Sequence, residues 1–179
     1  MDWICSPELI ASLSSSIRPV TIDAPLRQVL SEDFPKDCSG LPISGGWGYS
    51  QSDAIIFDRS KFASAIAARD FVSLEYHIVR KIVFEELIVF REKNNRFSGI
   101  DLEPDKKALI QEDDRMFDCL DFRISCWADQ HWEWLRDDWE RHGQLSSFDS
   151  ASHLAKREAS KIVYARQFWF DITGVFGSA

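Results

Sequence analysis

The apolar residues near the start of the chain follow helical spacing. Ser6 followed by Pro7 predicts a helix start, because serine accepts a backbone hydrogen bond at a helix cap and proline suits the first turn. The apolar residues within 9–17 would then share one face of this helix, and Pro19 would end it. A second short helix is expected at residues 24–30, so the chain begins with a helical segment.

The residues that follow predict an irregular segment, then a short strand and then a helix. Residues 31–52 are rich in glycine, proline and aspartate, which predicts a long irregular connection. Residues 54–57 predict a short strand. Asp70 is expected to cap a helix that runs to about Phe84, because apolar residues recur there every three or four positions.

The apolar run at residues 86–91 predicts a strand that directly follows this helix. A single long strand over residues 71–91 is the competing interpretation.

Residues 107–111 and 116–127 predict a β-hairpin whose turn lies at residues 112–115. Successive side chains of a strand point to opposite faces, so one face of the second strand would point toward the core. That face holds Leu120, Phe122 and Ile124.

The rest of the chain predicts two helices and a final apolar segment. Asp129 is expected to cap a helix that ends at Gly143, and Asp149 is expected to cap a helix over residues 150–164. Residues 168–172 are apolar enough to dock as a strand or a final turn.

The order of elements is therefore helices, a strand, a helix, strands and helices. This order favours an α+β fold, with a mostly antiparallel sheet and helices packed on it, over a doubly wound parallel sheet. A length of 179 residues suits one domain. We therefore expect a single domain over residues 1–179, with the helical segment at 1–35 and an α+β body at 36–179.

The sequence also indicates in which cellular compartment the protein is found. No apolar run approaches the roughly 20 residues that span a bilayer, and residues 1–5 lack the basic and apolar regions of a signal peptide. We therefore expect a cytoplasmic protein with no membrane partner. The 4 cysteines include no CxxC pair, so free thiols are expected in preference to disulfides or a zinc site.

The formal charge of −8 is concentrated in one part of the chain. Residues 101–140 hold 13 acids and 5 bases, a net charge equal to that of the whole chain. Direct nucleic-acid binding needs a basic footprint, which the sequence lacks. A basic protein partner would be attracted to this segment, and solubility alone is the competing explanation.

Several residues could carry chemistry, but none has a matching partner in the sequence. His131, His142 and His153 lie 11 residues apart, whereas metal pairs on helices use spacings of three or four. Glu85 and Glu86 could act in acid–base chemistry, yet no nucleophile or base is placed beside them. We therefore expect no catalytic residue, no metal and no cofactor.

Residues 44–50 form a glycine-rich loop that fits neither the dinucleotide-binding nor the P-loop pattern. Its glycines would let the backbone turn sharply around Trp47 and Tyr49. These two rings either pack inward or present a binding surface.

The helix beginning at Asp129 has an unusual distribution of tryptophans. At 100° per residue, Trp132, Leu135 and Trp139 form one stripe, which is expected to be buried. Trp134 falls on the opposite face among acids, where it would be an interface hot spot unless another segment covers it.

Two parts of the chain carry a resemblance to a known class of proteins. The string LPISGGWGYS at residues 41–50 is followed by DAIIF at residues 53–57. Further along, EELIVFR at residues 85–91 is followed by RFSGI at residues 96–100. With EY at residues 75–76, this pattern resembles small bacterial immunity proteins encoded beside Rhs-type and type VI secretion toxins, over roughly residues 40–171.

The resemblance implies a protein that binds a cognate toxin domain and occludes its active site. The groove of a nuclease toxin would be basic, so the acidic segment would be its counterpart. Charge and aromatic patterns, and not the resemblance, select the contact residues. These are Asp113, Asp114, Asp129, Glu133, Trp134, Asp137 and Asp138, with Trp47 and Tyr49 as a second patch.

Two other functions stay open. The chain could be an enzyme with a small-molecule pocket near the glycine-rich loop. It could instead be a structural or adaptor protein whose acidic helix is buried in a homodimer.

Overall fold

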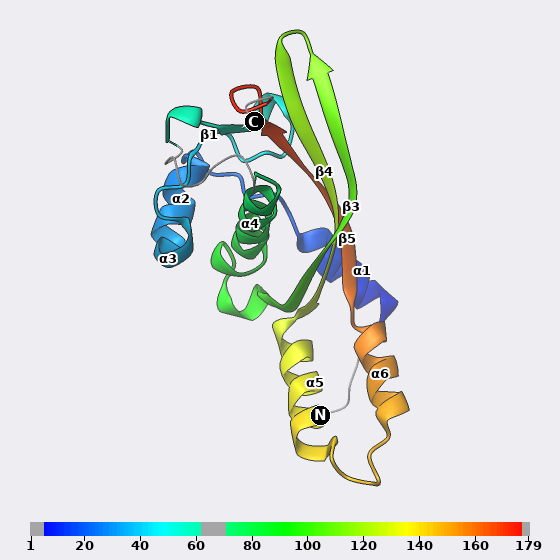
Figure 1. Cartoon of the computed structure of the whole chain (residues 1–179). Helices are drawn as coiled ribbons and strands as arrows, with labels where there is room; N and C mark the ends of the chain where they lie inside the picture. Colours follow the sequence, from blue (N-terminus) through cyan, green and yellow to red (C-terminus); the bar gives the residue numbers. More distant parts are fainter. Residues whose placement is uncertain (1–5, 62–70, 177–179) are drawn as a thin grey trace. The chain divides into compact units, whose positions relative to one another are not determined.

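The computed structural model describes residues 6–61 and 71–176, which form helices and one five-stranded sheet (Figure 1). The α+β fold predicted from the sequence is confirmed. The principal elements are α1 (Pro7–Ser16), α2 (Leu26–Asp33), α3 (Pro35–Cys38), β1 (Ile43–Gly45), β2 (Ile55–Phe57), α4 (Phe71–Phe84), β3 (Phe97–Glu112), β4 (Arg115–Ala128), α5 (Asp129–His142), α6 (Ser150–Ala159) and β5 (Ile162–Asp171).

The strands lie in the order β1-β2-β5-β4-β3. β1 and β2 are antiparallel, with Ile43 opposite Phe57, whereas β2 and β5 are parallel over Ile55 and Phe170. The sheet is mostly antiparallel, as expected. β3 therefore stands at one end of the strand order, and among the described strands it has a neighbour on one side only.

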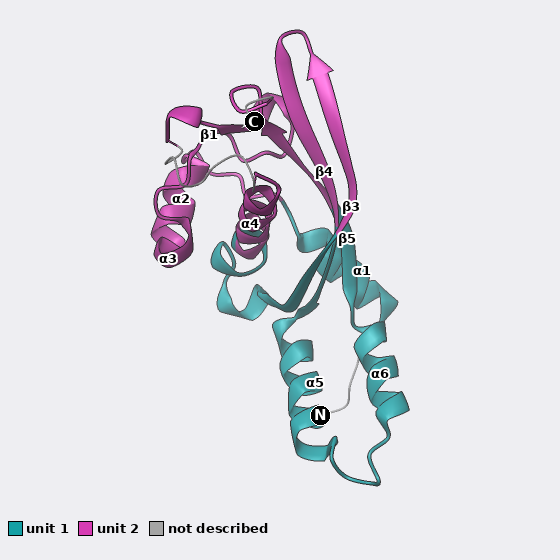
Figure 2. Cartoon of the chain, in the orientation of Figure 1, with its two compact units in different colours: residues 1–18, 85–103, 123–165 teal, residues 19–84, 104–122, 166–179 magenta. Residues whose placement is uncertain are grey.

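The chain divides into two compact units (Figure 2). Unit 1 comprises residues 1–18, 85–103 and 123–165, and unit 2 comprises residues 19–84, 104–122 and 166–179. β3, β4 and β5 each contribute residues to both units. The single domain expected from the length stays a prediction.

The core of unit 2 is built from phenylalanines of the sheet and the apolar face of α4. Phe57 stacks on Phe170 with a centroid distance of 5.6 Å, and Phe122 meets the ring of Tyr76 edge-on at 5.4 Å. The predicted helix that ends at Phe84 is confirmed, although its expected cap, Asp70, lies outside the described residues. Its apolar side is buried at Ile78, Val79 and Ile82.

The strand predicted at residues 86–91 is wrong, and so is the longer strand over residues 71–91. α4 instead continues into a π-helical turn, Glu85–Val89. The amide of Phe90 donates to the carbonyl of Glu85 at 3.0 Å, and Arg91 Nε donates to the carbonyl of Glu86 at 2.7 Å. A short apolar run has no periodicity that separates a strand from a buried helical turn, so these contacts decided the conformation.

The predicted hairpin is confirmed, but its strands are longer than expected. β3 and β4 extend over Phe97–Glu112 and Arg115–Ala128. Leu120, Phe122 and Ile124 are buried, as predicted.

Three of the four predicted helix caps lie within the described residues, and two of these three are confirmed. The Ser6 side chain accepts from the amide of Leu9 at 3.2 Å, and the Asp149 side chain accepts from the amide of Ser152 at 2.9 Å. Asp129 is not the cap of α5 but its first residue, and its carboxylate accepts from Ser98 Oγ at 2.7 Å.

The helices also differ from the sequence prediction in length. α6 ends at Ala159, earlier than predicted, because the chain turns at Ser160 and enters β5. Within the described residues, no helix combines the length and the apolar character needed to cross a bilayer.

Candidate partner-binding surface on the α5–α6 hairpin

α5 and α6 form a helical hairpin within unit 1, joined by a loop at residues 143–149. The amide of Gly143 donates the last helical hydrogen bond of α5, to the carbonyl of Trp139 at 2.8 Å, and Asp149 then caps α6. The α5–α6 hairpin therefore owes its two ends to residues that the sequence singled out.

One side of the α5–α6 hairpin contains an apolar cavity of about 290 Å³. Trp139 at its rim is 49% exposed. The residues that line the cavity are Trp132, Leu135, Arg136, Trp139, His153, Leu154 and Arg157.

The stripe of apolar residues on α5 that was expected to be buried is only partly buried, because it lines the cavity. Trp132, Leu135 and Trp139 do share one face, but only Leu135 is buried. Trp132 is half-buried against Trp127, with ring centroids 5.2 Å apart. Gly99, at φ 63°, makes this packing fit, because a Cβ there would lie 2.7 Å from the Trp132 ring.

α6 contacts the side of α5 that was expected to face solvent. The Lys156 ammonium lies 5.1 Å from the centroid of the Trp134 ring, and His153 Nδ1 lies 2.7 Å from Asp138 Oδ2. Trp134 is therefore half-buried, and its predicted place on an open outer face is wrong. The alternative, cover by another segment, is the observed one, and α6 supplies it.

An aromatic cluster stands where the two helices meet their loop. The Trp139 ring lies 5.7 Å from that of Phe148 and 5.6 Å from that of the buried His153. Hydrogen bonds from His153 and then His142 lower the pKa of Asp138 below its usual value. Asp138 is thus engaged within the α5–α6 hairpin, which leaves it less suited to a partner than the sequence suggested.

The acids that remain open on α5 lie beside the cavity. Glu133 and Glu140 are exposed, and Asp137 pairs with Arg141 at 3.4 Å, a contact on the helix surface. We call Glu133, Asp137 and Glu140 the acidic strip, since they lie within about 60° of one another at 100° per residue. Glu140, Trp139 and Leu154 were not among the predicted contact residues. The spacing of Glu140 from Glu133 and Asp137 could have revealed it, whereas Leu154 required knowledge of how α6 pairs with α5.

The two predicted aspartates of the β3–β4 turn, Asp113 and Asp114, lie in unit 2, so no common surface with α5 is described. Asp113 has φ 51°, a left-handed conformation that aspartate tolerates. Both are exposed at the tip of the turn.

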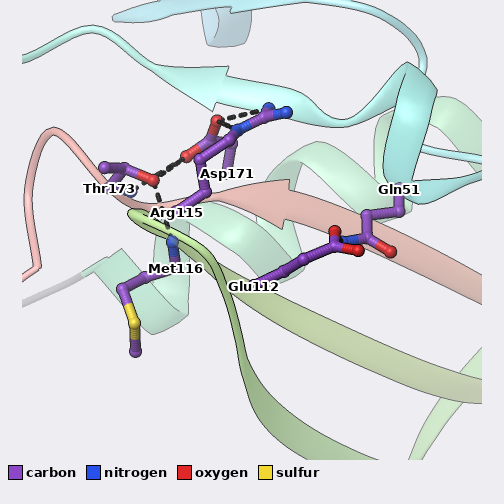
Figure 3. Close-up of polar contacts among 6 residues, drawn as sticks. All are labelled: Gln51, Glu112, Arg115, Met116, Asp171 and Thr173. Carbon is purple, nitrogen blue, oxygen red and sulfur yellow. Dashed lines mark hydrogen bonds and ion pairs between the residues drawn. The ribbon is translucent and has the colours of Figure 1, made fainter.

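Side chains on either side of this turn hold it in place (Figure 3). Arg115 Nη2 lies 2.7 Å from Asp171 Oδ2, and the amide of Met116 donates to Thr173 Oγ1 at 2.9 Å. Burial alone would raise the pKa of Asp171, but hydrogen bonds from Thr173 and Arg115 bring the net shift downward. Gln51 Nε2 donates to Glu112 at the other side of the turn.

The glycine-rich loop packs inward, the first of the two alternatives that the sequence left open. Trp47 is buried, and its Nε1 donates to the carbonyl of Ala24 at 3.1 Å. Tyr49 is half-buried, and its hydroxyl accepts from the amide of Val20 at 3.2 Å. Trp47 and Tyr49 therefore do not form the second surface patch expected for a partner.

The enzyme alternative placed a small-molecule pocket near the glycine-rich loop. A second cavity, of about 520 Å³, lies between α1 and the start of β5. Neither cavity is lined by Glu85, by Glu86 or by the glycine-rich loop. Within residues 6–61 and 71–176, no group of three or more His, Cys, Asp or Glu side chains could hold a metal ion.

Comparisons with protein-family models, with curated proteins and with solved structures give no match.

Proposed function

We propose that this chain is an immunity-type inhibitor that binds a cognate toxin domain through the α5–α6 hairpin. The observation that carries the proposal is Trp139, half-exposed at the rim of an apolar cavity and beside the acidic strip. Interface hot spots favour a tryptophan at a pocket with a polar surround.

The partner suited to this surface is a basic protein domain that inserts one apolar side chain. The cavity supplies the apolar contact, and Leu154 of α6 extends it with a side chain that is 54% exposed. α5 holds five acids and two arginines, a net charge of −3, so a basic surface would be attracted to it. Arg136 lines the cavity and lies 3.8 Å from both Asp137 and Glu140, so it offsets part of the negative charge of the acidic strip.

The toxin is inferred from the resemblance of residues 41–57, 75–76, 85–91 and 96–100 to immunity proteins. Inhibition would follow from occlusion, because a protein seated over a catalytic groove excludes the substrate. A nuclease domain fits best, since a groove that binds phosphates carries the basic charge that the acidic strip would meet.

A co-expression experiment tests the proposal. The C-terminal toxin domain encoded by the neighbouring gene is produced with and without this protein, and growth and co-purification are scored. We expect rescue of growth and a stable complex. Trp139→Ala should weaken the complex by about 2 kcal/mol, roughly 30-fold in Kd.

Phe176→Ala is the matched control, because this aromatic side chain of unit 2 is 51% exposed. It should leave the affinity unchanged. Rescue without a complex would favour the enzyme alternative, and no rescue would sink the immunity proposal. Equal loss in both variants would exclude the α5–α6 hairpin as the specific site.

A further inference from the structure

The outer edge of β3 is a second surface that the proposed function does not use. Within the described residues, β3 pairs with β4 and has no strand on its other side. Nearly all side chains of residues 104–112, the part of β3 in unit 2, are exposed. Leu109, in the middle of this part, is 54% exposed.

The turn determines which backbone groups of β3 are open. Asp113 and Asp114 form a two-residue turn, which makes Glu112 and Arg115 the closing pair of the hairpin. Antiparallel strands alternate the direction of their hydrogen-bonding groups. The amides and carbonyls of residues 105, 107, 109 and 111 therefore point away from β4.

Two opposite charges of this edge are placed symmetrically about Leu109. Lys106 and Glu112 each lie three residues from it, on opposite sides. If a second β3 lay antiparallel with Leu109 opposite its own copy, Lys106 would face Glu112 of that copy, and the same pair would recur on the other side. The like charges of Asp105 and Asp113 would meet only where β3 ends at the turn, and both side chains are exposed there. Residues 107, 109 and 111 would then form about six main-chain hydrogen bonds across the interface.

We propose that the β3 edge of unit 2 pairs with the β3 edge of a second copy of this chain, antiparallel and centred on Leu109. The contact extends the sheet across two chains and covers the exposed Leu109 side chains. It does not rest on the proposed function.

The edge is selective for a copy of itself. A lysine on an edge strand normally deters pairing with foreign strands, and Lys106 does so here unless an acid stands opposite. Lys107 presents no such obstacle, because its ammonium is held by Glu75 at 3.0 Å and by Asp118 at 2.7 Å. Gln51 holds the Glu112 carboxylate in place at the same edge.

Charge exchange tests the pairing. The mass in solution is measured by sedimentation over a concentration series. Wild type should rise from the 20.6 kDa of one chain toward twice that mass. Lys106→Glu and Glu112→Lys should each shift the rise to at least tenfold higher concentration, because like charges then face each other. The double variant K106E/E112K should recover the wild-type curve.

Leu109→Lys should keep the mass of one chain throughout, whereas Leu145→Lys, at an exposed leucine of the α5–α6 hairpin, should follow wild type. Thermal unfolding of Leu109→Lys checks that the exposed substitution leaves the fold intact. A wild type that stays at one chain throughout, or a dimer that survives Leu109→Lys, would overturn the proposal. Failure of the double variant to recover would do so as well.

Discussion

Lys107 Nζ donates a hydrogen bond to Oε2 of the fully buried Glu75 at 3.0 Å, a contact that ties β3 to α4 within unit 2. The same ammonium lies 2.7 Å from Asp118 Oδ2 on β4. Two buried acidic side chains therefore share one ammonium. Burial, and then the hydrogen bond and the charge of Asp118, raise the pKa of Glu75 to about 8, so its carboxyl holds a proton at neutral pH.

Glu75 should make folding stability depend on pH. Its ordinary pKa is 4.5 and its folded value about 8, so folding takes up a proton between these values. The stabilisation is fully present below pH 4.5 and is lost as the pH rises toward 8. Glu75→Gln should remove this slope, so that the variant gains several kcal/mol relative to wild type between acidic and alkaline pH. Urea unfolding at several pH values measures it, and Glu103→Gln, at an exposed acid of β3, is the control. An unchanged slope in Glu75→Gln would contradict the proton on Glu75.

Removing the shared cation should destabilise unit 2. Lys107→Met leaves the buried Asp118 carboxylate without its positive partner and Glu75 without its hydrogen-bond donor, at a cost of about 2 kcal/mol. The neighbouring exposed Lys106 is the matched control, and Lys106→Met should change the free energy of unfolding by less than about 0.5 kcal/mol. Both are measured by chemical denaturation at low protein concentration, where association is absent. Equal effects in the two variants would mean that the pair makes no special contribution.

Trp134 and Trp139 of α5 should separate an effect on stability from an effect on binding. Trp134 lies under Lys156 of α6, so Trp134→Ala should lower the free energy of unfolding by about 1–2 kcal/mol. Trp139→Ala should change it less, because half of that side chain is already exposed. Denaturation midpoints of both variants check this. The reverse order would place Trp134, and not Trp139, on the open surface.

The described cysteines should be inert in the native protein. Cys38, Cys119 and Cys126 are buried. Burial raises the pKa of Cys119 to about 11 and that of Cys126 to about 12, so almost no reactive thiolate forms at neutral pH. In a Cys5→Ser variant, a chromogenic disulfide reagent should react slowly with native protein and rapidly in denaturant. Rapid reaction of native protein would reveal an open thiol among the three.

Much of the fold could be predicted because its signals are local. The Ser6 and Asp149 caps, the α4 helix and the β3–β4 hairpin follow from neighbouring residues, and each is observed. The run at 86–91 failed because its spacing suits a strand and a buried helical turn equally. Arg91 contacts Glu86, Asn95 and Ser16. Ser16 is 75 residues away in the sequence, so the spacing of apolar residues near Arg91 could not predict this set of contacts.

The candidate surface was predicted only in part. The sequence placed charge on α5, and the acids Glu133 and Asp137 stand on its open side. It could not separate these from Asp138, which His153 engages from α6. The wheel grouped Trp132, Leu135 and Trp139 correctly but could not say whether that face would be covered.

The sequence by itself determined the α+β class, the paired strands and the acidic character of α5, since these depend on periodicity, caps and composition. Only the tertiary structure decided which face of α5 meets α6, that Trp47 packs inward, and that Glu75, Lys107 and Asp118 converge. The reason is physical: burial and pKa depend on which distant segments share a space. A helical wheel gives the direction of a side chain but not the neighbour it meets.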